Sequence, residues 1–283
     1  MAAVNRVTII GLGLIGGSLG MAIRKKRLAR EVVGFSRKPS TLKAAKRKGA
    51  IGSGSTHLRA AVAGADIVVL ATPVDLIVPL AKQIALWMKP GSVITDVGST
   101  KAKIVATLDR SLPKHVGFVG GHPIAGSEER GIEAADGALF DGSLCILTPT
   151  RKTAAKALKQ VADLWKPLVS QVVILGPKEH DRLLGATSHL PHLLAFALAG
   201  AVTPAGLPQA PRSFLDMTRI AKSDPDLWDD ILLSNREELV RLMDHFSKQW
   251  RTLRQALAAN DSRVLRKILA QAKAQRDALK HAS

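Results

Sequence analysis

The sequence is short of several residue types, beginning with tyrosine and cysteine. No tyrosine occurs among its 283 residues, and nothing in the sequence accounts for that. The single cysteine, Cys145, cannot form an intramolecular disulfide, and its place in the apolar run LCIL predicts a buried core residue in a reducing compartment. The rest of the composition, 46% hydrophobic and 23% charged, excludes disorder for most of the chain and is typical of a soluble globular protein.

Long hydrophobic runs and a secretory signal are also missing. The longest apolar stretch, residues 193–202, is too short to cross a bilayer. Only Arg6 precedes the glycine-rich turn at Gly11, whereas a secretory signal needs a basic segment ahead of an apolar one. We therefore expect a cytoplasmic protein without a membrane partner.

Acidic residues are few relative to basic ones. The chain has 41 lysine and arginine residues against 23 aspartate and glutamate residues, a net charge of +18 that favours anionic partners. Nucleic acid is one such partner. However, aromatic residues make up only 4% of the chain and no base-stacking motif is visible, so a solvated basic surface is the favoured interpretation.

Up to residue 176, short β-branched runs alternate with helical stretches, which is typical of a parallel βαβ sheet. The predicted strands are VTII, VVGF, IVVLATP, SVITDV, GFVGGHP, LCILTPT and VVILG, and the helices between them cover residues 18–28, 41–48 and 153–165. We therefore predict an α/β Rossmann-type domain over residues 1–176.

From residue 177 to the end, we predict an all-α domain for substrate binding and dimerisation. Apolar residues keep helical spacing through one long segment, at Leu227, Ile231, Leu239, Leu242, Phe246, Trp250, Leu253 and Leu257. Asp261 or Ser262 can cap a final, mostly basic helix that runs to about Lys280. A long helix as apolar as the segment over residues 227–257 often packs across a subunit boundary. We therefore expect a homodimer.

The segment VTIIGLGLIGGSLG carries the spacing of a dinucleotide-binding turn. Gly11 permits the tight turn, Gly13 lets the backbone approach a pyrophosphate, and Gly16 allows close helix packing, while the helix N-terminus attracts the anion. A purely structural glycine turn is the alternative. The residues predicted to contact the cofactor here are Gly11, Leu12, Gly13, Leu14, Ile15 and Gly16, with Thr72 and Pro73 at the end of IVVLATP.

The second predicted strand ends at Ser36, Arg37 and Lys38, where an NAD-binding protein usually has an acidic residue for the ribose 2′-hydroxyl. Ser36 can donate to a 2′-phosphate, and Arg37 can pair with it or stack on the adenine. We therefore predict that NADP is preferred and that NAD is used less well. The alternative is a solvated basic loop.

The candidates for chemistry are histidines in GGHP and SHLPH, a serine in DVGST and an arginine in DMTRIAKSDP. Each has a structural alternative when taken singly. His122 could cap a turn, His189 and His192 could be polar groups of the core, and Arg219 could form a surface ion pair. No metal site is predicted.

These strings, with GLGLIGGSLG and GGHPIAGSEERGIEAADGALFDG, closely resemble the prephenate and arogenate dehydrogenases of tyrosine biosynthesis, nearly from end to end. The resemblance implies a Rossmann domain, a helical dimerisation domain, and oxidative decarboxylation of prephenate to 4-hydroxyphenylpyruvate or of arogenate to tyrosine. Which of the two substrates is preferred stays open.

The resemblance also implies roles for individual residues. His122 matches the histidine that takes the proton of the substrate 4-hydroxyl, and Ser99 matches the serine that touches the same hydroxyl and orients the histidine. His192 matches a histidine that binds the side-chain end of the substrate, and Arg219 matches an arginine that pairs with a substrate carboxylate.

Two neighbouring residues fall where relatives vary with substrate preference. Ser127 follows Gly126, and Glu128 beside it could contact an amino group of the substrate. The glycine-rich segment that relatives carry before DxTR is replaced here by residues 210–213, where Arg212 is either a second carboxylate anchor or simply exposed. A hydroxyacid dehydrogenase of similar architecture, with a catalytic lysine in IAKSDP, is the main alternative, but it leaves GGHP unexplained.

Overall fold

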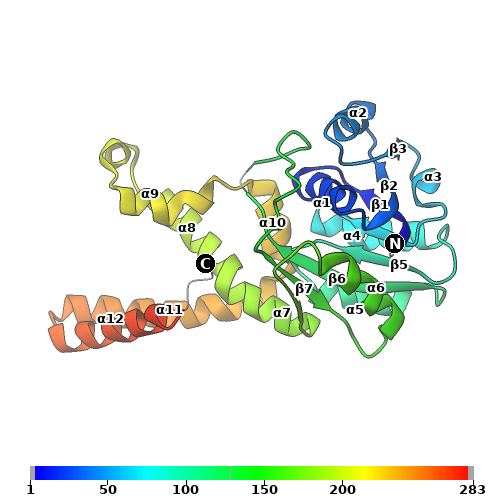
Figure 1. The fold of residues 1–283 in the computed structure, drawn as a ribbon. Helices are drawn as coiled ribbons and strands as arrows, with labels where there is room; N and C mark the ends of the chain where they lie inside the picture. Colours follow the sequence, from blue (N-terminus) through cyan, green and yellow to red (C-terminus); the bar gives the residue numbers. More distant parts are fainter. Residues whose placement is uncertain (1–3, 128, 280–283) are drawn as a thin grey trace. The chain divides into compact units, whose positions relative to one another are not determined.

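A computed structural model describes residues 4–127 and 129–279 (Figure 1). By the packing of its backbone, the chain divides into two compact units that meet in sequence between Asn235 and Arg236. The predicted functional boundary after residue 176 stays a prediction.

The first unit is built on one eight-stranded sheet, with the strand order β3-β2-β1-β4-β5-β6-β7-β8. The strands are β1 (Val4–Ile10), β2 (Ala29–Phe35), β3 (Ser53–Ser55), β4 (Ile67–Leu70), β5 (Ser92–Asp96), β6 (Val116–Ile124), β7 (Leu144–Thr148) and β8 (Gln171–Ile174). The predicted Rossmann-type α/β fold is confirmed.

One strand pair departs from the predicted parallel arrangement. β6 and β7 are antiparallel, with His122 opposite Ile146, whereas the other adjacent pairs are parallel. The described residues between them form turns and no helix, so the chain returns without the crossover that a parallel pair needs.

Helices cover both faces of the sheet, as expected of a doubly wound fold. They are α1 (Leu14–Lys25), α2 (Pro39–Arg47), α3 (Leu58–Val62), α4 (Val74–Ala85), α5 (Ala102–Ser111) and α6 (Ala155–Trp165). One apolar cluster joins the sheet to α1, α2 and α6, and another joins it to α3, α4 and α5. Cys145 is fully buried in the first cluster, as predicted, and burial raises the pKa of its thiol.

A continuous helix over Pro177–Ala201 follows the sheet. It consists of α7 (Pro177–Leu184), a π-helical turn over Gly185–His189 and α8 (Leu190–Ala201). This helix is longer than the apolar run predicted at residues 193–202, and by length and composition alone it could span a membrane. A single helix of this kind is weak evidence for a membrane span, and 22% of its most apolar stretch is buried within the described part of the chain. π-helical turns occur frequently at functional sites.

The last part of the first unit is a series of short helices. They are a 3₁₀ helix over Pro204–Gln209, α9 (Arg212–Thr218), a 3₁₀ helix over Arg219–Lys222 and α10 (Pro225–Ser234). Asp224 caps α10 by accepting a hydrogen bond from the backbone nitrogen of Asp226 at 2.7 Å. No strand follows β8 in the described part of the chain, as the sequence predicted.

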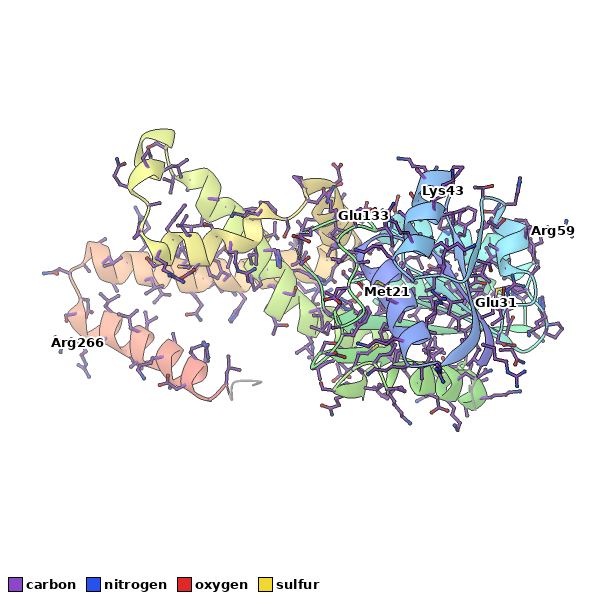
Figure 2. The ribbon with its side chains drawn as sticks, turned by 45° about the horizontal axis from the view of Figure 1, so that its top comes forward. Met21, Glu31, Lys43, Arg59, Glu133 and Arg266 are labelled. Atoms are coloured by element: carbon purple, nitrogen blue, oxygen red, sulfur yellow. The ribbon has the colours of Figure 1, made fainter. Side chains whose placement is uncertain are left out.

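The second unit consists of α11 (Arg236–Ala258) and α12 (Ser262–Asp277), which contact each other. Asp261 caps α12 through the backbone nitrogen of Val264 at 3.0 Å, and Arg266 is among the side chains that radiate from this basic helix in Figure 2. The predicted end near Lys280 lies outside the described residues.

The prediction of one long helical segment through residues 227–257 is wrong. The segment breaks at Asn235, which separates α10 from α11. The Asn235 side-chain amide donates to the Asp181 carbonyl oxygen at 2.9 Å and lies 3.1 Å from Nδ1 of His189. Those tertiary hydrogen bonds, which apolar spacing does not reveal, hold Asn235 in a non-helical conformation.

Candidate functional site

The glycine turn joins β1 to α1 and has the geometry that a dinucleotide needs. Gly11 adopts a φ of +95°, and a side chain on it would overlap the Ala71 carbonyl oxygen. A side chain on Gly16 would overlap the Gly11 carbonyl oxygen, so both positions require glycine. At Gly13, by contrast, no atom lies within 4 Å of the place where a Cβ would sit. The turn is therefore open at the one glycine where a pyrophosphate would approach.

Thr72, at the end of β4, gives a second sign of a ligand beside this turn. Its hydroxyl oxygen is buried and has no hydrogen-bond partner among the described residues. Its methyl carbon would lie 3.2 Å from a Cβ on Gly11, and Pro73 follows as the N-cap of α4. An unpaired buried hydroxyl is costly unless a ligand satisfies it, so the residues present fit a dinucleotide.

The remaining residues of the turn contribute unequally. Leu12 is buried in the hydrophobic core, so it can offer a ligand only its backbone, whereas Leu14 and Ile15 are half-buried at the start of α1. The sequence pattern therefore identified the turn correctly and could not say which side chains face away from it.

The basic residues after β2 lie between that strand and α2. The Ser36 hydroxyl is half-buried and accepts a hydrogen bond from the backbone nitrogen of Lys38 at 3.2 Å, while the Arg37 and Lys38 side chains are exposed. The acidic residue of β2, Glu31, lies near the opposite end of the strand, where it pairs with Arg6 at 3.4 Å. No described carboxylate of β2 therefore occupies the ribose-binding position.

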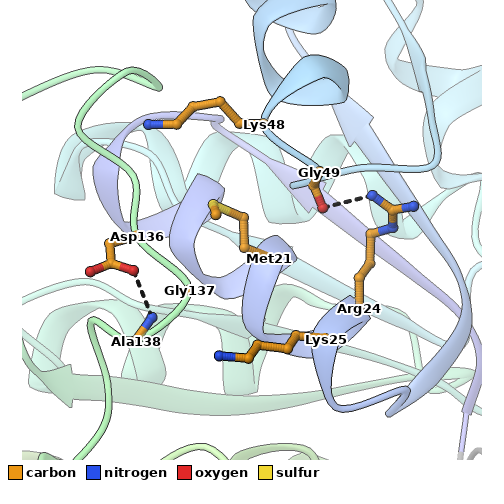
Figure 3. A pocket seen from close by; sticks show the side chains of 8 residues that line it. All are labelled: Met21, Arg24, Lys25, Lys48, Gly49, Asp136, Gly137 and Ala138. Carbon is orange, nitrogen blue, oxygen red and sulfur yellow. Dashed lines mark hydrogen bonds between the residues drawn. The ribbon is translucent and has the colours of Figure 1, made fainter.

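A second cavity near α1 collects basic side chains without belonging to this turn (Figure 3). Arg24 and Lys25 lie in the last turn of α1, where cations compensate the helix dipole. Arg24 donates to the Gly49 carbonyl oxygen at 2.6 Å, and Lys48 donates to the Glu133 carbonyl oxygen. Part of the large positive charge is therefore used to satisfy backbone carbonyl groups.

The candidate substrate site is a pocket of about 580 Å³ in the first unit. It lies beyond the carboxyl ends of β5 and β6, and α7, α8 and α10 also contribute to its wall. Five of the residues predicted for substrate and catalysis line it, namely Ser99, His122, Ser127, His192 and Arg219. Glu128 lies outside the described residues.

His122, near the end of β6, lines the pocket and is held by a hydrogen bond from behind. Its Nδ1 lies 2.9 Å from Nε2 of His180, and Nδ1 of His180 lies 2.8 Å from a carboxylate oxygen of Asp181. Burial, followed by the nearby His180, Lys101 and His189, holds the pKa of His122 well below its usual range. The His122 imidazole is therefore neutral near pH 7 and can accept a proton.

An ion pair that the sequence did not suggest lies behind His122. Lys101 and Asp96 are both fully buried and form a hydrogen-bonded pair. The Asp96 carboxylate also accepts from the backbone nitrogens of Gly98 at 2.9 Å and Gly121 at 3.2 Å. This pair ties the loop after β5 to β6, and it thereby fixes the backbone around Ser99 and His122.

His192 lies on α8 and faces Trp228 of α10. The two rings stack with their centroids 3.6 Å apart, and Nδ1 of His192 lies 2.9 Å from the Ser188 carbonyl oxygen. Burial lowers the pKa of His192. His189 lies nearby in the π-helical turn, where burial lowers its pKa to about 4, and it contacts Asn235 rather than the pocket. The structural alternative considered for these histidines thus fits His189, whereas His192 lines the pocket and its substrate-binding role stays a prediction.

Two arginines line the pocket, and a third does not. Arg219 begins the 3₁₀ helix before α10, and Arg130 forms an ion pair with Asp224. The Arg212 side chain is 93% exposed on α9, lies 3.9 Å from Asp216 and does not line this pocket, which favours the exposed interpretation of the two. Sequence reasoning did not identify Arg130, Trp228, His180, Asp181, Asp96 or Lys101.

A weak signal for the missed residues was present in the sequence. The motif DVGSTK ends in a lysine and KEHD places a histidine beside an aspartate, but such pairs are ordinary on exposed surfaces. Only burial distinguishes them, because a buried charge is retained when it is paired.

The comparisons with known proteins identify the family. The model of the prephenate dehydrogenase nucleotide-binding domain matches residues 19–181, and that of the prephenate dehydrogenase dimerization domain matches residues 176–271. The chain is 35% identical to a prephenate dehydrogenase of Bacillus subtilis, with 97% of this chain and 76% of the relative covered.

Two solved structures are similar over nearly the whole chain. The first is the prephenate dehydrogenase of Aquifex aeolicus in complex with hydroxyphenyl propionate and NAD+, with a TM-score of 0.89, 35% identity and coverage of 97% and 98% of the two chains. The second is the Synechocystis arogenate dehydrogenase, with a TM-score of 0.83, 27% identity and coverage of 96% and 99%. The match favours this family over the hydroxyacid dehydrogenase alternative, and we conclude that the chain belongs to the prephenate dehydrogenase family.

Proposed function

We propose that this protein catalyses the oxidative decarboxylation of prephenate, arogenate or both, in tyrosine biosynthesis. One observation carries the proposal: the neutral imidazole of His122 lines a pocket at the carboxyl ends of the strands, in a sheet that also carries the open glycine turn. Membership of the family and the similarity to both a prephenate and an arogenate dehydrogenase support it.

His122 acts as the base in the proposed reaction. Its free nitrogen takes the proton of the substrate 4-hydroxyl while the hydride leaves the carbon that bears this hydroxyl. A nicotinamide cofactor held at the glycine turn would supply the acceptor for that hydride. The bond between the ring and its carboxylate then breaks, carbon dioxide departs, and the electron pair left behind makes the ring aromatic. His122 returns its proton to the resulting phenolate oxygen.

The other residues of the pocket bind and orient the substrate. The Ser99 hydroxyl is half-buried near the end of β5 and hydrogen-bonds the same 4-hydroxyl. Arg219 pairs with a substrate carboxylate, because a guanidinium holds a carboxylate through two parallel hydrogen bonds. His192 and Ser127 contact the side-chain end, where prephenate and arogenate differ. The glycine turn, Thr72 and Pro73 hold the cofactor.

The direct test measures the absorbance of reduced cofactor with prephenate and with arogenate, using one preparation of the full chain. We expect turnover with at least one of the two substrates and release of carbon dioxide in equal amount. Absence of turnover with both, in a folded protein supplied with NAD and NADP, would refute the proposal.

We further propose that NADP is preferred over NAD. In support, Ser36, Arg37 and Lys38 follow β2, where no described carboxylate of that strand could accept from a ribose 2′-hydroxyl. Each charge-assisted contact contributes about 1.5 to 3 kcal/mol, so one pair with a 2′-phosphate gives roughly a tenfold to hundredfold preference, and less if it is exposed.

Changing Ser36→Asp together with Arg37→Ala is expected to reverse that preference. The new carboxylate accepts from the ribose hydroxyl of NAD and repels the 2′-phosphate of NADP. The ratio of kcat/KM for the two cofactors, in the wild type and the double variant, is the measurement. Arg59→Ala, an exposed arginine on α3, is the control. Equal use of both cofactors by the wild type, or an unchanged ratio in the double variant, would identify the loop as a solvated surface.

The protein is also proposed to form a homodimer through its helical part, in support of which residues 176–271 match a dimerization domain. Four apolar side chains of α11 are exposed and lie at helical spacing, namely Val240, Met243, Trp250 and Leu257. Such a stripe is typical of a helix that packs against a partner.

Replacing Trp250 with Glu is therefore expected to shift the protein from dimer to monomer. Trp250 is 61% exposed, and a charge placed in an apolar interface opposes association. Light scattering across a concentration series gives the result, and Thr252→Glu, which adds the same charge to another side of α11, should leave the dimer intact. If the W250E protein remained dimeric, the dimer interface would have to involve other residues than this stripe.

A further inference from the structure

We propose that His180 and Asp181 form a positioning pair that fixes His122 as the tautomer with its proton on Nδ1, leaving Nε2 as the basic nitrogen. The proposal deepens the function proposed above, since it concerns the same site and rests on His122 acting as the base there. Neither residue of the pair lines the pocket.

One hydrogen bond joins His122 to His180, and a second joins His180 to Asp181. Nδ1 of His122 lies 2.9 Å from Nε2 of His180, and Nδ1 of His180 lies 2.8 Å from Oδ1 of Asp181. The exposed fraction is 0% for His180 and 5% for Asp181, so water does not compete for these hydrogen bonds. Three groups therefore interact in one row, in which His180 and Asp181 are buried and His122 reaches the pocket.

The position of each proton follows from the last member of the row. A carboxylate can only accept hydrogen bonds, so the proton between His180 and Asp181 belongs to Nδ1 of His180. Burial lowers the pKa of His180, which makes its ring neutral, and a neutral imidazole carries one proton. Nε2 of His180 is then an acceptor, and the donor facing it must be Nδ1–H of His122.

The other nitrogen of His122 is thereby left without a proton. Nε2 forms no hydrogen bond to another residue in the described part of the chain, and His122 lines the pocket. The lone pair that the proposed reaction needs is thus placed on the one nitrogen that is not engaged with the protein.

Backbone hydrogen bonds fix the Asp181 carboxylate in the position where it accepts the proton of His180. Its Oδ1 accepts from the backbone nitrogen of Lys101 at 2.7 Å, and its Oδ2 accepts from that of Ala102 at 2.8 Å. Its own carbonyl oxygen accepts from the Asn235 amide at 2.9 Å. Asp181 therefore links α7 to the start of α5 and the end of α10, and its carboxylate cannot rotate away from His180 without breaking the two bonds to the start of α5.

The three hydrogen-bonded groups also stabilise the positive charge that forms on His122 during turnover. When Nε2 of His122 takes a proton, the positive charge is stabilised by donation from Nδ1–H to His180, whose ring is polarised by Asp181. The other charged groups next to the row, Lys101 and Asp96, are paired with each other. Among the other described titratable neighbours, His189 is neutral because burial lowers its pKa to about 4, and the Cys145 thiol is neutral because burial raises its pKa.

The test is the tautomer of His122, read by ¹⁵N NMR of histidine-labelled protein without substrate. In the wild type near pH 7, we expect Nδ1 of His122 to give the signal of a protonated nitrogen and Nε2 that of an unprotonated one. The reverse assignment would overturn the proposal. This measurement does not depend on turnover, so it decides the proposal even if neither substrate proves to be used.

Replacing His180 with Phe tests what the row contributes to the reaction. The variant keeps both Asp181 bonds to the start of α5, fills the buried space with a ring, and removes the acceptor for Nδ1–H. We expect the Nδ1–H signature to be lost and kcat to fall about tenfold to a hundredfold with KM little changed, because partners that orient a functional histidine have effects of that size.

The control is the same substitution at His115, whose Nε2 lies 3.2 Å from the Ala85 carbonyl oxygen outside the pocket. We expect H115F to keep the wild-type tautomer of His122 and the wild-type kcat. A folded H180F variant with an unchanged tautomer and a kcat within twofold of H115F would refute the proposal. If H180F does not fold, the wild-type spectrum alone supports or refutes it.

Discussion

Replacing His122 with Asn is expected to lower turnover by about a hundredfold or more, because assistance by a general base is typically worth about 10² to 10⁴ in rate. Asparagine has a similar size and can still accept a hydrogen bond from the substrate hydroxyl, but it cannot take the proton. Binding of the cofactor should survive, because the glycine turn and Thr72 lie at the ends of other strands, β1 and β4.

The measurement is kcat with the preferred substrate, accompanied by titration of cofactor binding to the same variant. His115→Asn provides a matched control outside the pocket. The low pKa of His122 adds a second readout: a base with a lowered pKa stays unprotonated to lower pH, so wild-type activity should persist below the usual imidazole value of about 6.5. Near-normal turnover in a folded H122N protein would show that His122 is not the base of the reaction.

Replacing Arg219 with Ala is expected to raise KM, with a smaller effect on kcat. A hydrogen bond to a charged group contributes about 1.5 to 3 kcal/mol, which corresponds to roughly a tenfold to 150-fold rise. The Arg219 side chain is exposed at the pocket wall before substrate binds, so screening by solvent places the expected rise toward the lower end of that range. Arg219→Lys should recover only part of the loss, since lysine keeps the charge without the planar, two-pronged donor.

Steady-state kinetics of both variants give the result, and Arg212→Ala, which removes an exposed arginine from α9, should leave KM unchanged. Unchanged saturation kinetics in R219A would assign Arg219 to the surface, and Arg130 would become the leading partner for the substrate carboxylate. Arg130 also lines the pocket, but it is already paired with Asp224.

Local pattern was enough to predict the nucleotide-binding half. A tight turn, a close approach and a helix N-terminus are properties of consecutive residues, so the spacing of Gly11, Gly13 and Gly16 predicted them, and the conformation of Gly11 and the packing of Gly16 agree. The alternation of β-branched runs likewise predicted the main strands. It missed the three-residue strand β3, because so short a run carries no periodicity.

The helix boundaries were less well predicted, for two reasons. α1 begins at Leu14, four residues before its predicted start at Ser18, because the helix includes glycines that apolar spacing does not recognise. The break at Asn235 arises from hydrogen bonds to Asp181 and His189, residues about fifty positions away. A local pattern contains no information about such partners.

The sequence by itself determined which residue types are available: a glycine turn for a dinucleotide, His122 in GGHP, Ser99 in DVGST and Arg219 in DMTR. Only the tertiary structure decided how they work together. It placed Asp181 and His180 behind His122, buried the Lys101–Asp96 pair, and turned Arg212 outward. The physical reason is that proton position and charge depend on burial and on the partners of each group, and those partners come from separate strands and helices that meet only in the folded chain.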